Sequence, residues 1–195
     1  MSDLTQQVLS HLDPASIEAI AAQLGIDPSQ AEAAIQQAVP VVVGGLARNA
    51  STDAGADALH NAAADHAGGD IGSILGSVLG GGGDGGAILG HIFGNRQGQA
   101  AQNVGQASGI GTQNAGALMS ILAPIVMAAL GNMTRKQGMN SGGLGDMLGK
   151  ELQNIGQGQH GGLLGSILDQ DGDGQLGLGD LLKVGSQMFG SRGRV

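Results

Sequence analysis

One pattern that occurs twice places the strongest constraint on the fold. Aligning Pro40 with Pro124 superimposes GIDPSQAEAAIQQAVPVVVGGL, which starts at Gly25, on GIGTQNAGALMSILAPIVMAAL, which starts at Gly109. Self-similarity over such a length indicates a repeated supersecondary unit. We therefore expect a duplicated helical unit whose two copies pack around a pseudo-two-fold axis. The identical pairs are Gly25/Gly109, Ile26/Ile110, Ala31/Ala115, Ala33/Ala117, Pro40/Pro124, Val42/Val126 and Leu46/Leu130.

Helix boundaries are well marked in the first copy. Asp13–Pro14 and Asp27–Pro28 each combine an N-cap acid with a proline at the first helical position. Gln30 completes a capping-box pattern with the second of these, and Gly25 is a typical helix end. Pro40 lacks an amide hydrogen and crowds the preceding turn, so it should kink or break a helix. We expect the segment VVVGGL to continue as a second short helix with Pro40 near its start.

The residues available for a core favour helices over strands. The chain has 39 glycines and neither Trp nor Tyr, and its only aromatic residues are Phe93 and Phe189. A core must then be built from Ala, Leu, Ile, Val and Met, which suits closely packed helices. Each glycine costs about 0.5–1 kcal/mol relative to alanine inside a helix. The composition therefore predicts an all-α fold of short helices with flexible joints and modest stability.

Glycine-rich segments define the predicted domain organisation. We expect a duplicated multihelical domain over residues 1–156, with repeat units at about 13–66 and 101–152 and a Gly-rich connector at 67–100. Residues 157–195 are expected to form a Gly-rich tail. The connector carries short apolar clusters separated by glycine. This pattern fits either short ordered helices on flexible hinges or a low-complexity linker, and the sequence leaves both open.

Charge and hydropathy limit the classes of binding partner and the cellular location that we expect. A net charge of −8 argues against non-specific binding to nucleic acid or anionic membranes, which needs clustered Lys and Arg. The N-terminus has neither the basic region nor the apolar segment of a secretory signal, so a cytoplasmic location is expected. Ala115–Gly131 is apolar, but it is shorter than the ~20 residues of a membrane span. It also contains Pro124, and a buried core helix is the favoured interpretation.

Several of these segments resemble a known family. The helix–Pro–helix units, GGAILGHIFGNRQ in the connector and LAPIVMAALG in the second copy resemble the YidB-like bacterial proteins, known as domain of unknown function 937. The similarity covers roughly residues 1–155. The resemblance implies an all-helical, cytoplasmic bacterial protein. It implies no activity, substrate or catalytic residue, so it assigns no functional position to this chain.

An Asp-rich loop near the C-terminus carries the clearest chemistry. Residues 169–180, DQDGDGQLGLGD, fit the twelve-residue EF-hand pattern. Ca²⁺ prefers oxygen ligands, and alternate positions of such a loop direct their side chains inward. Gly174 occupies the sharp turn, and Leu176 occupies the apolar anchor position. The predicted metal ligands are Asp169, Asp171, Asp173 and Asp180 through their carboxylates and Gln175 through its backbone carbonyl.

The loop departs from the common EF-hand pattern in ways that should weaken calcium binding. Asp180 stands where Glu is commoner, so the closing carboxylate is shorter by one methylene, and Gly177 would need a water as ligand. The incoming segment LLGSIL is short and contains Gly165. An Asp at the last position resembles the calcium loops of dockerin modules. We expect an affinity on the order of 10⁻⁵–10⁻³ M, with Mg²⁺ as a possible competitor. The alternative is a solvated Asp/Gly turn that only caps a helix.

No motif specifies catalysis. Gly81, Gly83 and Gly86 satisfy G-x-G-x-x-G, but a dinucleotide site needs a preceding strand that the sequence does not indicate. The histidines show no recognised metal spacing, and no G-x-S-x-G elbow is present. The segment SIEAIAAQLGIDPSQAEAAIQQAV has helix–turn–helix character, but it contains no basic residue. Phosphate contacts of a DNA-binding helix would require one.

These observations predict a non-enzymatic calcium-binding structural or interaction protein. Calcium would order the C-terminal tail and dock the apolar segment Leu181–Phe189 onto another surface. The expected partner is a second copy of the chain or another protein, with no small-molecule substrate identified. The alternative is a helical regulatory or DNA-associated module in which the Asp-rich loop is only a helix cap.

Overall fold

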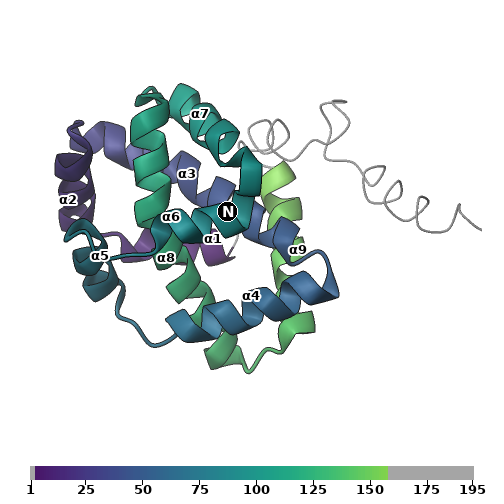
Figure 1. Cartoon of the computed structure of the whole chain (residues 1–195). Helices are drawn as coiled ribbons and strands as arrows, with labels where there is room; N and C mark the ends of the chain where they lie inside the picture. Colours follow the sequence, from purple (N-terminus) through teal and green to yellow (C-terminus); the bar gives the residue numbers. More distant parts are fainter. Residues whose placement is uncertain (1–2, 158–195) are drawn as a thin grey trace, which may run out of the picture.

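The computed structural model describes residues 3–157, and within this range it contains helices and turns but no strand. The predicted all-α fold class is confirmed. Figure 1 shows the helices arranged around two long ones, α3 and α8. The elements are α1 (Asp3–His11), α2 (Pro14–Leu24), α3 (Pro28–Asn49), α4 (Asp53–His66), α5 (Ile71–Leu79), α6 (Gly85–Phe93), the 3₁₀ helix η1 (Gly94–Arg96), α7 (Gln97–Ser108), α8 (Gly111–Gln137) and α9 (Ser141–Gln157).

The two proline-containing helices form the centre of the molecule. Every residue from Ala38 to Ala47 in α3 is buried, and so is every residue from Ile121 to Gly131 in α8. A helix that is buried on all sides has neighbours around its whole circumference. The two helices contact each other, and the shorter helices cover their remaining faces. The apolar runs after each proline therefore become the core.

The outer helices pack on opposite sides of this centre. Figure 1 shows α2 and α5 together on one side and α4 with α9 on the other, and both pairs are in contact. α6 and α7 contact both α3 and α8. α1 is held by the fully buried Leu4 and Val8, and Glu151 of α9, itself buried, accepts a hydrogen bond from the amide of Leu4. The N-terminal helix is thus anchored to the last described one.

The predicted starts of α2 and α3 and the predicted end of α2 are confirmed. Asp13 caps α2 by accepting a hydrogen bond from the Ser16 amide at 2.8 Å, and hydrogen bonds from Ser16 lower the pKa of the Asp13 carboxyl. Gly25 ends this helix in the left-handed region, with a φ of 66°. Gln30 completes a capping box by accepting from the Asp27 amide at 3.3 Å. Local sequence chemistry alone specifies these ends.

The expected break at Pro40 is wrong. α3 runs without interruption from Pro28 to Asn49, and Pro124 likewise lies inside α8. Each proline removes the hydrogen bond to the carbonyl four residues earlier. For Pro40 that residue is Gln36, which is exposed and open to water. Burial on both sides of the proline stabilises the helix enough to offset one lost hydrogen bond, so tertiary packing overrides the local tendency to break.

Matching features recur in the two copies. Gly25 ends α2 and Gly109 ends α7, both with left-handed backbone, at φ values of 66° and 75°. In both cases the next helix contains the proline, Pro40 in α3 and Pro124 in α8. The helix pairs α2–α3 and α7–α8 therefore share a glycine at the end of the first helix and a proline inside the second. The duplication itself, its pseudo-two-fold axis and the proposed repeat limits stay predictions.

The Gly-rich connector at 67–100 is folded. It contains α5, α6 and η1 and the start of α7. Its apolar clusters bury Ile71, Leu75, Leu89 and Phe93. The interpretation as short ordered helices is the correct one, and the low-complexity alternative is wrong. Packing against α8 offsets the low helix propensity of the glycines.

α8 also has the length and composition of a membrane-crossing helix. It is the one helix in residues 3–157 that meets both criteria, and 78% of its apolar window is buried inside the fold. That degree of burial is typical of a core helix. The expected core position of Ala115–Gly131 agrees with this burial.

Candidate functional site

The predicted calcium ligands lie outside the described residues. These are Asp169, Asp171, Asp173, Gln175 and Asp180. Within residues 3–157, no group of three His, Asp or Glu side chains is placed to hold a metal ion.

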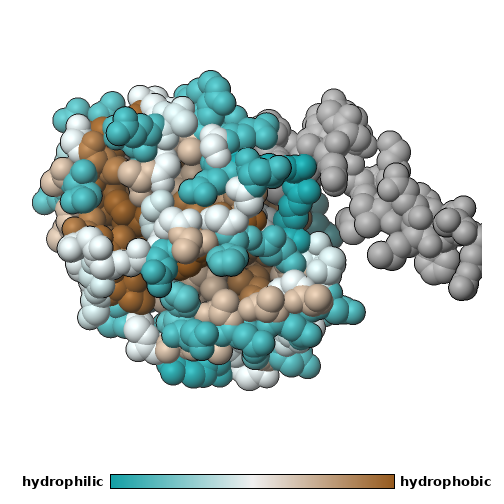
Figure 2. Space-filling view, viewed as in Figure 1, coloured by the Kyte–Doolittle hydropathy of each residue, from teal (hydrophilic) through white to brown (hydrophobic). Residues whose placement is uncertain are grey.

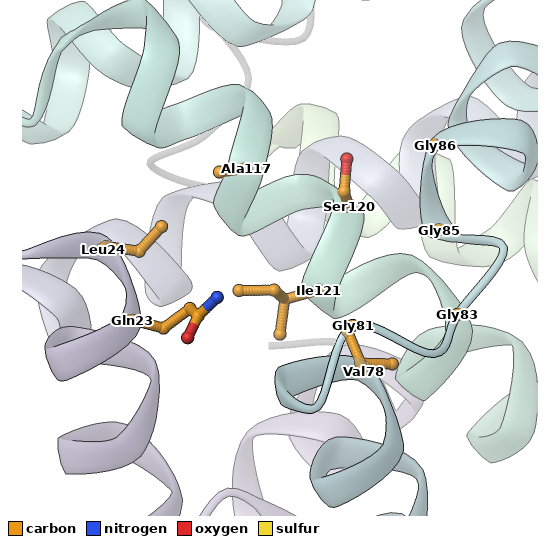
Figure 3. Close-up of a pocket in the computed structure, with 10 residues that line it drawn as sticks. All are labelled: Gln23, Leu24, Val78, Gly81, Gly83, Gly85, Gly86, Ala117, Ser120 and Ile121. Atoms are coloured by element: carbon orange, nitrogen blue, oxygen red, sulfur yellow. The ribbon is translucent and has the colours of Figure 1, made fainter.

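A first hollow lies where the end of α2 and the start of α6 approach α8. Its volume is about 310 Å³. Leu24, Val78 and Ile121 supply apolar walls, and the loop between α5 and α6 supplies a glycine edge. Figure 3 shows the Gln23 amide and the Ile121 side chain pointing toward one another, while the Ser120 hydroxyl points away.

The lining of this first hollow is mostly apolar and glycine-rich. None of the described residues that line it is titratable, and the Ser120 hydroxyl donates to the Gly116 carbonyl at 3.0 Å within its own helix. Gly81, Gly83 and Gly86 all line it. The element before this glycine motif is the helix α5, so the strand–turn–helix context of a dinucleotide site is missing here.

A second hollow lies between the end of α3 and the junction of α6 with η1. Its volume is about 370 Å³, and its lining includes Arg48, His91 and Arg96. Arg48 is half-buried, and its pKa is lowered first by desolvation and then by the positive charge of Arg96. Of the two hollows, this is the one whose described lining contains charged side chains.

The second hollow was not predicted from the sequence. Arg48 and Arg96 are the only Lys or Arg residues before Arg135, which is the signal that could have drawn attention to them. Nothing in their spacing shows that they meet, because they belong to separate helical elements far apart in the chain. Only the packing of α6 against α3 brings them together.

The histidines of α4 have structural partners. The Nε2 atom of His60 lies 3.0 Å from the Met139 carbonyl, which ties α4 to the connection between α8 and α9. Nδ1 of His66 lies 2.8 Å from the Ala62 carbonyl within its own helix. Both side chains are half-buried rather than freely solvated.

The second helix of the helix–turn–helix segment is α3. The C-terminal half of α3 is buried, and the exposed positions of its N-terminal half include Gln30, Glu32 and Gln36. Arg48 lies near the other end of the helix, in the second hollow. Cationic side chains that could contact phosphates are therefore absent from the exposed face of α3 in the described structure.

Comparison with known proteins identifies the family. The sequence model of a family described as bacterial protein of unknown function (DUF937) matches residues 6–133. The chain belongs to this family. The match covers α2 to α7 completely and most of α1 and α8, so it includes both proline-containing helices and both hollows. The DUF937 description gives no activity, and it transfers no catalytic or binding role to these residues.

No curated protein and no solved structure matched the DUF937 chain.

Proposed function

We propose that this DUF937 protein is a non-enzymatic calcium-binding structural or interaction protein of the YidB-like type. The observation that carries the proposal is the spacing of Asp169, Asp171 and Asp173, followed by Gly174 and the closing Asp180. Carboxylates at alternate positions around a sharp glycine turn are the hard oxygen ligands that Ca²⁺ prefers.

Calcium would act by neutralising the carboxylates of this loop. Their mutual repulsion would fall on binding, and the loop backbone would be held in one conformation. Leu181–Phe189 follows directly and is rich in apolar residues. Its docking would need an apolar surface, and Figure 2 shows such surface on the side of α2 and α5, where Ile74 and Val78 are half-buried.

Hydroxyl geometry in the helical domain supports the non-enzymatic part of the proposal. Ser108 donates to the Val104 carbonyl at 2.6 Å, and Thr134 donates to the Leu130 carbonyl at 2.8 Å. These hydroxyls bond to their own helices, an arrangement that serves helix structure and does not activate a nucleophile.

Calcium titration of the full-length protein tests the proposal. Isothermal calorimetry should show one Ca²⁺ site with an affinity on the order of 10⁻⁵–10⁻³ M. Asp171→Ala removes a central carboxylate and should weaken binding by about tenfold or more, the equivalent of about 1.4 kcal/mol. Mg²⁺ should compete at higher concentration because it tolerates the irregular loop geometry less well.

Asp146→Ala is the matched control. Asp146 is an exposed acid on α9, and its loss changes the net charge by the same amount as the loop variant. Calcium affinity should be unchanged in Asp146→Ala. Equal weakening in both variants would show diffuse attraction to an acidic surface, and the absence of any heat or melting change in the natural protein would contradict the calcium site itself.

A further inference from the structure

The second hollow is formed where the end of α6 packs closely against α3 at Gly45 and Asn49. A Cβ added to Gly45 of α3 would lie 2.5 Å from Cγ2 of Ile92 and 2.9 Å from the Phe93 ring. The Asn49 side chain donates to the carbonyl of His91 at 3.1 Å and to that of Ile92 at 3.3 Å. These contacts hold the last turn of α6 against α3, so the rim of the hollow is defined by packed elements.

The same packing brings two guanidinium groups to one place. Gly94 turns the chain from α6 into η1 with a φ of 56°, a left-handed value that glycine adopts at little cost. The turn places Arg96 on the lining that Arg48 also forms. The charge of Arg96 contributes to the lowered pKa of Arg48, after the larger effect of desolvation. Two like charges therefore face a partly desolvated space.

The charge of this site is opposite to that of the chain. The net charge is −8, yet Arg48 and Arg96, the first two Lys or Arg residues in the sequence, both line one hollow. Among the described residues that line it there is no Asp or Glu. His91 and Asn95 add polar groups at the edge. A concave positive site in an acidic protein raises the local concentration of anions.

We propose that this hollow binds the phosphoryl group of a small molecule, with Arg48 and Arg96 as its charged partners. A phosphate monoester carries about −1.5 to −2 charge at pH 7 and three acceptor oxygens. Each guanidinium has five N–H donors, so Arg48 and Arg96 can both donate to these oxygens while keeping other partners, whereas a single carboxylate offers only two acceptor oxygens. The volume of about 370 Å³ falls within the ~300–1,000 Å³ of small-molecule sites. A nucleic acid would need several more cationic contacts than two.

Calorimetry of the full-length protein with phenyl phosphate and with inorganic phosphate tests this proposal. EDTA in the buffer keeps calcium out, and the ionic strength is held constant. We expect saturable binding at one site, tighter for phenyl phosphate because its ring adds contact with the apolar side of the hollow. Arg48→Gln and Arg96→Gln should each weaken phenyl phosphate binding by about tenfold or more.

Arg135→Gln is the matched control, because Arg135 is an exposed arginine of α8 outside the hollow. The affinity of the Arg135→Gln variant for phenyl phosphate should equal that of the natural protein. Absence of saturable binding, or an equal loss in Arg135→Gln, would overturn the proposal. Equal affinity for inorganic phosphate would overturn the assignment to a phosphorylated small molecule.

Amide chemical shifts of the natural protein give a measurement that does not depend on the folding of any variant. Phenyl phosphate should shift the amides of Asn49, Gly94 and Asn95 and leave Gly138 at the end of α8 unchanged. Succinate, a dicarboxylate, should produce smaller shifts at equal concentration. Shifts confined to residues outside the hollow, or succinate shifts as large as those of phenyl phosphate, would overturn the phosphoryl site.

Discussion

Gly116 and Gly131 belong to the same helix, but their surroundings differ at the level of single atoms. A Cβ added to Gly131 would clash with the carbonyl oxygen of Ala63, because α4 crosses α8 at this point. A Cβ added to Gly116 would meet the Ala101 side chain at 3.7 Å, an ordinary contact. The absence of a side chain at Gly131 is therefore a condition for the approach of two helices.

Alanine substitutions at these two glycines should change stability in opposite directions. Gly116→Ala should raise the free energy of unfolding by about 0.5–1 kcal/mol, since alanine loses less backbone entropy in a helix. Gly131→Ala should lower it by roughly 1–3 kcal/mol, because α4 must shift to admit the methyl group. Urea unfolding followed by circular dichroism measures both, and a stabilised Gly131→Ala protein would contradict the close approach.

The carbonyl of Ser120 shows how one residue accommodates a neighbouring element. Pro124 deprives it of its helical hydrogen bond, and the backbone of Gly85 lies directly against it, where a Cβ would clash. The first residue of α6 thus covers a carbonyl that α8 leaves without its usual partner. Weak Cα–H contacts to carbonyl oxygens recur where helices pack this closely.

At the scale of elements, the short helices α5 and α6 differ in how they begin. Asp70 caps α5 by accepting from the amide of Ser73 at 3.1 Å and from its hydroxyl at 3.2 Å. Asp84 stands at the equivalent position before α6 but makes no such side-chain bond. Both helices contact α8, but only α5 has a side-chain cap at its start.

Removing the two acids should therefore have unequal effects. Asp70→Ala should lower the free energy of unfolding by about 1 kcal/mol through loss of the cap. Amide hydrogen exchange should rise mainly within Ile71–Leu79. Asp84→Ala removes the same charge without removing a cap and should be close to neutral. If the two variants were equally destabilised, the effect would come from charge and not from the cap.

At the scale of the whole molecule, the core is aliphatic and centred on α3 and α8. Leu122 is fully buried in α8 and belongs to the continuous core cluster, whereas Leu152 on α9 is only half-buried at its margin. Phe93 is the single aromatic member of this core in the described structure, and it lies at the contact between α6 and α3. The stability of the fold therefore comes from the close packing of many aliphatic side chains, each of which contributes a small amount.

Leu122→Ala should lower the free energy of unfolding by about 2–5 kcal/mol, because it leaves a cavity that surrounding helices fill only in part. Leu152→Ala should cost clearly less, since less apolar area is removed from contact. Denaturant unfolding monitored by two independent probes gives both values and tests for one cooperative transition. Similar decreases in the free energy of unfolding in the two variants would contradict a core centred on α3 and α8.

Much of the helical layout follows from the sequence because its causes are local. Asp13, Asp27 and Gly25 act on the amides and dihedral angles next to them, so their roles are visible without any tertiary contact. The all-α class follows in the same way from aliphatic and small residues that suit packed helices. The calcium loop is also a local pattern, and it lies among residues that the structure does not describe.

Other features were decided only by the tertiary structure. α3 and α8 pass through Pro40 and Pro124 because burial by neighbouring helices outweighs one lost hydrogen bond in each. The Gly-rich connector is helical because α8 receives its apolar faces. Arg48 and Arg96 line the same hollow because Gly45 has no side chain that would keep the end of α6 away from α3. These elements are distant in sequence, so the sequence alone does not show their approach. The sequence determined where most helices begin and end, since capping is local. The fold determined which helices stay continuous and which charges converge, since both depend on burial between distant segments.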